Sequence, residues 1–391
     1  MKIWNNNPNF QGKMPLIDRP KDKKAILNLL EVFPVTAILG PRQVGKTTLA
    51  KTFKPDHIFD LENPRDMVLL ENPQLALESL NGLIMIDEIQ RKAELFPLLR
   101  YLVDQNPDQK YLILGSASSS LRQQSGESLA GRIGYHYLTG LNLTEVEIEN
   151  IDKLWLRGGF PRSFLTNTEE QSLTWRNNFI ATFLERDLRL LGINIPASTM
   201  FRFWIMLSHY HGQTINYSEL ARSFGISSKT VKVYLSILED TFMLRQLMPW
   251  HVNVGKRLVK SPKIYLRDSG IFHALQSIEN HQTLRTHPKL GASWEGFALE
   301  EIVSLVGKRD SEVFFYGTHG GVELDLYWQE GKNKIGVEFK FMDAPRTTKS
   351  MHQAVSDLAL SKLFVVYPGD RIYPLTEKII VTPLKDIGSL L

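Results

Sequence analysis

Short apolar runs that end in glycine or small polar residues recur through the first part of the chain. They cover residues 34–40, 82–87 and 110–115, and a further apolar stretch follows at 133–138. Unbroken apolar runs of this length are typical of strands buried on both faces of a parallel sheet. The segment 46–53 after the first run has helix-forming character. The alternation predicts an α/β fold built on a parallel sheet.

A different periodicity occupies residues 216–244. Its apolar positions are spaced to face one core from two consecutive helices, with Gly225 at the turn and Ser227 placed to cap the second helix. The inward-facing set comprises Leu220, Phe224, Ile226, Val231, Leu235 and Leu238. This pattern predicts a helix-turn-helix. Two extended segments around Asn253 and Gly255 would then form a wing, which would carry Lys256, Arg257, Lys260 and Lys263.

Alternating apolar and polar positions return in residues 312–341, which predict two strands joined by a glycine-containing turn. Asp325 lies on the first strand, and Glu338 and Lys340 lie two apart on the second. Because side chains alternate across a strand, Glu338 and Lys340 are expected on one face. A helix at 293–306 is predicted to precede these strands. A helix at 349–360 and a strand at 362–368 are predicted to follow them.

Composition narrows the class of protein. A chain of 391 residues suggests two to four domains at roughly 150 residues each. The absence of cysteine excludes disulfides, thiolate catalysis and cysteine metal sites, and fits a reducing cytosol. A net charge of +4 permits nucleic-acid binding without requiring it. Residues 1–10 lack a signal-peptide pattern, and no run approaches the ~18 apolar residues of a membrane span. We therefore expect a soluble, cytoplasmic protein with no membrane partner.

The stretch GPRQVGKTT fits the phosphate-loop pattern G-x-x-x-x-G-K-[ST], in the strand, loop and helix context that this motif requires. Lys46 is predicted to reach the β and γ phosphates of ATP and Thr47 to bind Mg²⁺, while Gly40 and Gly45 let the backbone approach the nucleotide. The predicted ATP contacts are Gly40, Pro41, Arg42, Gln43, Val44, Gly45, Lys46, Thr47 and Thr48.

Polar residues that follow the other apolar runs are expected at the edge of the sheet where the phosphate loop lies. Asp87 is predicted to hold Mg²⁺ through water, and Glu88 to polarise the water that attacks the γ-phosphate. Ser116 is predicted to sense that phosphate. Arg132 has two interpretations of equal weight: a guanidinium that reaches the γ-phosphate of a neighbouring subunit in a homo-oligomer, or a surface ion-pair residue.

Together these elements resemble the AAA+ ATPases, with GPRQVGKTT as Walker A, LIMIDEIQ as Walker B and LILGSASSSL as the sensor-one strand. The pattern from about residue 18 to 385 resembles a bacterial and archaeal family in which an AAA+ module is fused to a C-terminal domain of unknown function. The resemblance implies a P-loop AAA+ domain at 1–150, a helical connector at 151–200, a winged helix-turn-helix at 201–285 and a restriction-endonuclease-like α/β domain at 286–391.

Asp325, Glu338 and Lys340 are similar to the D-x(n)-E-x-K signature of restriction-endonuclease-like nucleases. In that chemistry the two carboxylates bind Mg²⁺, and the lysine positions the attacking water. Glu295 and Glu301 on the preceding helix are candidates for an additional metal ligand, with Glu295 favoured. A nuclease-like fold can also lose activity and persist as a binding platform, so cleavage stays open.

Two functions from different classes remain. In the first, a Mg²⁺-dependent ATPase acts on nucleic acid, DNA above all, through Ser228, Lys229 and Lys232 of the second helix and through the wing lysines. In the second, a nucleotide-dependent switch uses its C-terminal domains to bind protein partners and cuts nothing.

Overall fold

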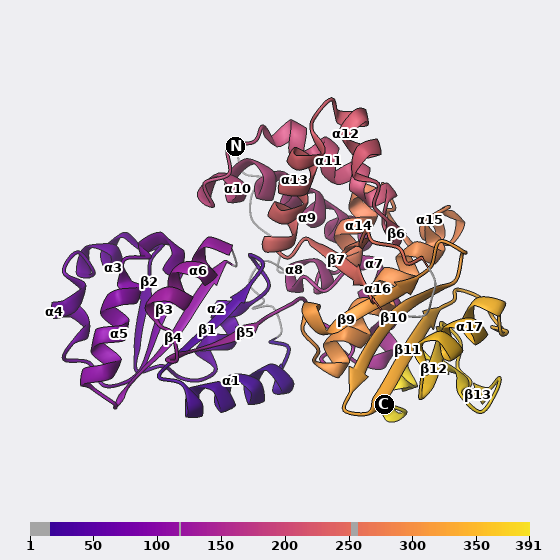
Figure 1. Ribbon diagram of the computed structural model, residues 1–391. Helices are drawn as coiled ribbons and strands as arrows, with labels where there is room; N and C mark the ends of the chain where they lie inside the picture. The colour runs from indigo at the N-terminus through magenta and orange to yellow at the C-terminus, as the bar shows by residue number, and fades with distance from the viewer. Residues whose placement is uncertain (1–15, 117–118, 252–256) are drawn as a thin grey trace, which may run out of the picture.

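Two separate β-sheets organise the chain, and they lie side by side in Figure 1. The computed structural model describes residues 16–116, 119–251 and 257–391. The first sheet belongs to the N-terminal part and the second to the C-terminal part, while the middle of the chain is mostly helical. None of the helices in these described ranges is both long and apolar enough to cross a bilayer.

The N-terminal sheet is parallel throughout, with strand order β2, β3, β4, β1, β5. Its strands are β1 Val35–Gly40, β2 His57–Asp60, β3 Gly82–Asp87, β4 Gln109–Ser116 and β5 Ile133–Tyr137. The apolar runs of the sequence form all of these strands except β2, so the predicted α/β class and parallel sheet are confirmed. Strand β2 lies at the sheet edge with no fully buried residue, which explains why no apolar run marked it.

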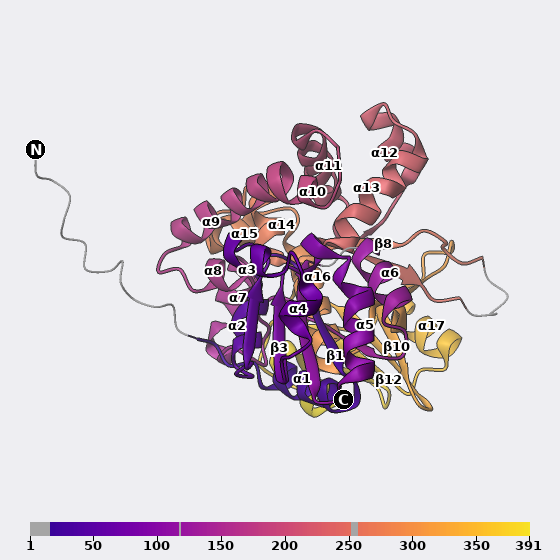
Figure 2. The ribbon, with the colours of Figure 1, turned by 90° about the vertical axis from the view of Figure 1, so that its left-hand side faces the viewer.

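Helices cover both faces of this sheet, as Figure 2 shows from the side of the N-terminal domain. They are α1 Pro20–Val32, α2 Lys46–Lys51, α3 Pro64–Leu69, α4 Pro73–Leu77, α5 Leu95–Gln105 and α6 Ser119–Ser128. Ile38 of β1 packs in one core with α1 and α2, whereas Ala37 and Leu39 pack in another with α5. Burial on both faces is why β1 has no polar alternation.

The middle of the chain is mainly helical, and residues between 160 and 275 supply a second core, while residues 154–156 and Leu284 join the core of the C-terminal domain. Its helices are α7 Ile151–Arg157, α8 Pro161–Phe164, α9 Glu169–Thr182, the π-helix Phe183–Asp187, α10 Leu188–Leu190, α11 Ala197–His209, α12 Tyr217–Phe224, α13 Ser228–Asp240, α14 Ser269–Leu275 and α15 His281–Thr286. The predicted helix-turn-helix positions are confirmed in α12 and α13: Gly225 turns the chain at φ +64°, and the Ser227 side chain accepts from Thr230 N at 3.0 Å. Four of the six predicted inward-facing residues are buried in the second core, and the other two, Phe224 and Ile226, are partly buried against it.

The C-terminal sheet has nine strands in the order β13, β14, β12, β11, β10, β9, β7, β8, β6. They are β6 Gln213–Thr214, β7 Leu244–Pro249, β8 Lys263–Leu266, β9 Val313–Gly317, β10 Glu323–Glu330, β11 Asn333–Phe339, β12 Lys362–Tyr367, β13 Tyr373–Pro374 and β14 Ile379–Pro383. Strand β7 pairs with β8 on one side and with β9 on the other. One sheet therefore continues across the predicted boundary at residues 285 and 286.

Residues 312–341 form three strands, β9, β10 and β11, so the expectation of two strands was wrong. The chain turns twice, at Gly321 and at Gly331, and both glycines have positive φ. Strand β9 also pairs with β7, and no local pattern could indicate this pairing. The predicted helix at 349–360 and the strand at 362–368 are confirmed by α17 Lys349–Leu358 and β12.

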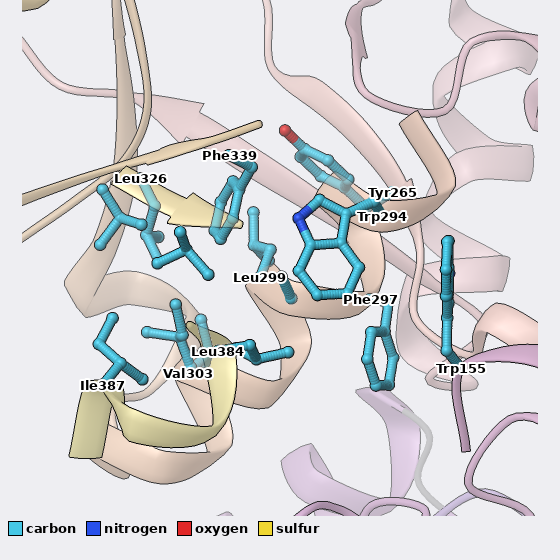
Figure 3. Packing of buried hydrophobic residues seen from close by; sticks show 14 of the residues in the cluster. Trp155, Tyr265, Trp294, Phe297, Leu299, Val303, Leu326, Phe339, Leu384 and Ile387 are labelled. Carbon is cyan, nitrogen blue, oxygen red and sulfur yellow. The ribbon is translucent and has the colours of Figure 1, made fainter. Parts of the chain in front are cut away.

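Helix α16 Leu290–Val306 packs on one face of the C-terminal sheet and α17 on the other. Figure 3 shows aromatic residues of α16 meeting Trp155 of α7. The Trp155 and Trp294 rings lie edge to face with centroids 5.4 Å apart, and Trp155 stacks on Phe297 at 6.3 Å. These contacts join the helical connector to the C-terminal domain in a shared core.

Candidate functional site

The phosphate loop connects β1 to α2 at the carboxyl edge of the N-terminal sheet. Gly45 has φ +98°, a left-handed conformation that glycine adopts without strain. Lys46 begins α2, and its Nζ donates to Gly40 O at 3.0 Å and to Pro41 O at 2.8 Å. The ammonium group thus lies inside the curve of its own loop, where nucleotide phosphates are predicted to bind.

Helix α2 and two strands bring three further predicted residues to the same edge. Thr47 Oγ1 donates to Asp87 Oδ2 at 2.6 Å, where β3 ends. Ser116 ends β4 directly beside Gly40 of β1. Its hydroxyl is buried and has no hydrogen-bond partner among the described residues. The arrangement places two adjacent side-chain oxygens, of Thr47 and Asp87, and the unsatisfied Ser116 hydroxyl at the edge of the sheet where Lys46 lies.

Burial dominates the electrostatics of this edge. It lowers the pKa of Lys46 to about 8, against the opposing effects of the Glu88 and Asp87 carboxylates. Burial likewise raises the pKa of Asp87 and of Glu88, which the Lys46 ammonium partly offsets. Lys46, Asp87 and Glu88 are charged groups held largely out of water. Buried charges need partners, and a bound ligand could provide them here.

A cavity of about 480 Å³ opens beside the loop, within the range of roughly 300–1,000 Å³ that is usual for small-molecule sites. The loop residues 42–48 form one wall. Residues 16–19 form another, and Pro161, Arg162 and Leu165 at α8 form a third. Arg162 was not predicted as a site residue. The sequence feature that could have indicated it is the stretch GGFPRSF at residues 158–164. The cavity thus combines the phosphate loop with a basic side chain from the connector.

Arg42, in the middle of the phosphate loop, points toward the helical region. Its NH1 lies 2.8 Å from Asp187 Oδ1, and its NH2 lies 3.6 Å from Glu88 Oε2 and 3.8 Å from Glu62 Oε1. Asp187 ends the π-helix, and burial raises its pKa while Arg42 lowers it. The loop is therefore ion-paired with both the predicted water-activating carboxylate and a residue of the next domain, a connection that sequence reasoning missed.

Arg132 lies at the opposite edge of the sheet from the phosphate loop, just before β5. Its Nε and NH2 donate to Asp104 at 2.6 and 2.9 Å. The hydrogen bonds that Arg132 donates to Asp104 raise the pKa of Arg132 and lower that of Asp104. Within the single chain Arg132 is a surface ion-pair residue, and its contact with a neighbouring subunit stays a prediction.

The C-terminal carboxylates converge around a lysine. Lys263 Nζ lies 2.8 Å from Asp325 Oδ1 and 3.3 Å from Glu295 Oε1, and it also contacts Glu323. Tyr265 OH donates to Glu295 Oε1 at 2.6 Å. We call Lys263, Glu295, Glu323 and Asp325 the carboxylate cluster. Although burial alone would lower the pKa of Lys263, the surrounding carboxylates raise it well above its usual value.

Glu338 and Lys340 lie beside this cluster and contact each other. Lys340 Nζ donates to Glu338 Oε1 at 2.7 Å, as expected for residues on one face. Phe339 N, between them, donates to Asp325 Oδ2 at 3.0 Å. Burial and the nearby Asp325 raise the pKa of Glu338 to about 8, and the same causes raise that of Glu295 to about 7.

Two predicted positions need correction. Lys263 was expected on an exposed wing, but it lies in β8 and is 1% exposed, because the carboxylate cluster surrounds it. Glu301 lies apart from the cluster and accepts from Leu143 N at 2.8 Å. Arg257 and Lys260 are exposed as predicted, whereas Asn253, Gly255 and Lys256 lie outside the described residues.

The helix-turn-helix presents a basic surface. Lys229 and Lys232 of α13 are exposed, and Ser228 is partly exposed at its first turn. Arg222 of α12 is exposed as well. Lys232 Nζ lies 5.1 Å from the centre of the Tyr217 ring, which holds its long side chain against α12. Three cationic side chains are thereby available to a partner.

Three protein-family models match successive parts of the chain. Residues 32–147 match the AAA domain family, and residues 148–282 and 290–387 match two domains of unknown function, DUF8612 and DUF4143. The uncharacterized proteins Rv2008c of Mycobacterium tuberculosis and Mb2031c of Mycobacterium bovis are each 45% identical over 376 residues, which cover 95% of this chain and 85% of theirs. A Walker-type ATPase of Pyrococcus abyssi is 17% identical, with a TM-score of 0.48 over 68% of this chain and 99% of that one.

The AAA domain and its phosphate loop define a nucleotide-binding ATPase of AAA type. The chain belongs to the family of the two mycobacterial proteins, in which such an ATPase domain is fused to C-terminal domains of unknown function.

Proposed function

We propose that the protein is a Mg²⁺-dependent ATPase whose nucleotide state controls how its helix-turn-helix engages nucleic acid, with DNA as the first candidate. The observation that carries the ATPase proposal is the convergence of Lys46, Thr47, Asp87 and Ser116 at one sheet edge. Mg²⁺ takes oxygen ligands, and the adjacent Thr47 hydroxyl and Asp87 carboxylate fit it. When bound there, the ion would neutralise charge on the phosphates.

Each residue of the nucleotide site has a separate task in this proposal. Lys46 would exchange its two loop carbonyls for the β- and γ-phosphate oxygens as acceptors. Glu88 would orient the attacking water and accept its proton, for which a carboxylate of raised pKa is suited. Ser116 would donate its unused hydroxyl hydrogen to the γ-phosphate.

The link to the rest of the chain would pass through Arg42. A γ-phosphate beside the loop would compete with Asp187 for the Arg42 guanidinium, because phosphate and carboxylate are both bidentate acceptors for arginine. Loss of the pair would release the π-helix and the core that it shares with α12 and α13. Both views place α12 at the outer end of the molecule, away from the N-terminal sheet. The end of α13 lies close to that sheet, because the ring of Phe242 is 5.9 Å from the ring of Tyr137 in β5.

A second candidate function, a switch that binds protein partners, is favoured by two observations. The three cationic side chains on α12 and α13 are few for a DNA contact, and the predicted nuclease residues lie around Lys263. The proposal therefore contains no cleavage step. An assembly in which Arg132 reaches a neighbour's nucleotide would first require both hydrogen bonds to Asp104 to break.

DNA binding in defined nucleotide states tests the proposal. Fluorescence anisotropy of a labelled duplex and a single strand would be measured with the Glu88→Gln variant in ATP and with wild type in ADP. We expect at least a fivefold difference in affinity between the two states. Absence of binding to DNA or RNA at low salt, in either state, would favour the protein-binding switch.

A further inference from the structure

We propose that the Lys263 ammonium group takes the place of a divalent cation in the carboxylate cluster, so that this centre holds strand β8 and not a metal ion. The inference concerns a centre apart from the nucleotide site and does not depend on ATP hydrolysis. It starts from the position of Nζ, which contacts the carboxylates of Glu295, Glu323 and Asp325 together. Carboxylate oxygens on several sides are the surroundings that a divalent cation would require.

The predicted metal ligands do not fit a metal ion in this arrangement. No set of three histidine, aspartate or glutamate side chains within the described ranges is arranged to hold one. Asp325 accepts from Lys263 through one oxygen and from Phe339 N through the other. A divalent ion bound by the same oxygens would stand within a few ångströms of a buried ammonium group, and the two like charges would repel.

The backbone holds Lys263 in place. Strand β8 pairs with β6 through Thr214 opposite Lys263, and with β7 through Leu247 opposite the same residue. Strand β7 is in turn tied to α16, because Arg245 donates to both oxygens of Glu300 at 2.6 and 2.8 Å. The ladders on both sides fix the backbone of Lys263, while its buried ammonium group is held by the ion pairs with Glu295, Glu323 and Asp325.

Glu338 is the member of the predicted triad that Lys263 does not satisfy. One of its oxygens accepts from Lys340, and the other is buried without a partner in the described structure. Its side chain is 9% exposed. Removal of the Lys263 charge would leave Glu295, Glu323 and Asp325 without the cation that they share, and Glu338 lies near Asp325. A variant without this lysine therefore gains oxygen ligands for a cation.

Mn²⁺ binding tests the proposal without reliance on any enzymatic activity. Nucleotide-free full-length protein would be titrated with Mn²⁺, with free ion followed by electron paramagnetic resonance, for wild type, Lys263→Gln, Lys263→Gln/Asp325→Asn and Asp325→Asn. Lys308→Gln is the matched control, because Lys308 pairs with Glu330 outside the cluster at 3.6 Å. Circular dichroism would establish that each variant is folded.

We expect Lys263→Gln to bind one more Mn²⁺ per chain than wild type. The dissociation constant of this added site should be at least tenfold lower than that of any wild-type site that depends on Asp325. The added site should disappear in Lys263→Gln/Asp325→Asn and be missing from Lys308→Gln. A folded Lys263→Gln with wild-type Mn²⁺ binding would overturn the proposal. If Lys263→Gln does not fold, wild type and Asp325→Asn decide: equal Mn²⁺ binding supports the proposal, and a site that disappears with Asp325 refutes it.

Discussion

Arg42 and Asp187 form an ion pair between the phosphate loop and the π-helix, with 2.8 Å between NH1 and Oδ1. The two residues are 145 positions apart in the sequence. Asp187 is buried, so its charge depends on this partner. The pair provides a direct physical route from the nucleotide site to the helices that follow.

Substitution of Asp187 should uncouple the helical region from nucleotide binding. In wild type, a non-hydrolysable ATP analogue is expected to change hydrogen-exchange protection across residues 183–191, because phosphate competes for Arg42. Asp187→Asn should lose that change and still bind the analogue. Arg186→Ala is the matched control, since the neighbouring arginine is largely exposed and 3.6 Å from Glu62. An undiminished response in Asp187→Asn would contradict the route through Arg42.

Arg42→Ala should destabilise the folded protein by about 3 kcal/mol, because it leaves the Asp187 carboxylate buried without a counter-charge. The double variant Arg42→Ala/Asp187→Asn should recover part of that stability. Chemical denaturation of the set measures the interaction as a double-mutant cycle. Purely additive effects would show that the two side chains do not interact.

Removal of the Thr47 hydroxyl should weaken the use of Mg²⁺. Thr47→Ala is expected to raise the Mg²⁺ concentration for half-maximal ATP hydrolysis about tenfold, since it removes an oxygen ligand beside Asp87. Thr52→Ala serves as the control, because Thr52 Oγ1 donates to the backbone at Leu49 O, at the end of the same helix. Equal Mg²⁺ requirements in both variants would exclude Thr47 as a ligand.

The basic face of α13 predicts salt-dependent binding to DNA. Lys229→Ala/Lys232→Ala should weaken binding and reduce the slope of log affinity against log salt by about 1 for each phosphate that a lysine no longer neutralises. Lys24→Ala removes an exposed lysine of α1 and should leave the slope unchanged. If the two lysine changes left both affinity and slope at wild-type values, DNA would have to bind elsewhere.

Glu301 should make stability depend on pH. Burial raises its pKa to about 8 from an ordinary value of 4.5. Between these values the folded protein keeps a proton that the unfolded chain releases, so this residue lowers the free energy of unfolding as pH rises. Glu301→Gln stays neutral and should gain stability relative to wild type from pH 4.5 to 8. Glu31→Gln changes an exposed position of α1, and its free energy of unfolding should depend on pH as in wild type. If Glu301→Gln showed the same pH dependence as wild type, the raised pKa of Glu301 would be contradicted.

The sequence predicted those parts of the fold that local pattern determines. Strand β3 is buried on both faces and appears as an apolar run, while the partly exposed edge strand β2 does not. Gly225 and Ser227 marked the helix-turn-helix because turns and caps need particular residues. The phosphate loop was evident because its chemistry is contiguous in sequence.

Features that depend on distant partners were missed. Lys263 stands among other lysines in an extended segment, a pattern typical of solvated strands. Its burial requires Asp325, 62 positions later. The pairing of β7 with β9 and the ion pair of Arg42 with Asp187 are likewise set by packing between domains. No periodicity within either segment encodes them.

ATP turnover by two variants of the phosphate-loop site tests the central claim most directly. Nucleotide binding and phosphate release would be measured for wild type, Lys46→Ala and Glu88→Gln with Mg²⁺. We predict that Lys46→Ala binds no ATP, and that Glu88→Gln binds ATP with wild-type affinity and releases phosphate at least a hundredfold more slowly. Wild-type turnover in both variants would contradict the claim that this loop and its carboxylate hydrolyse ATP.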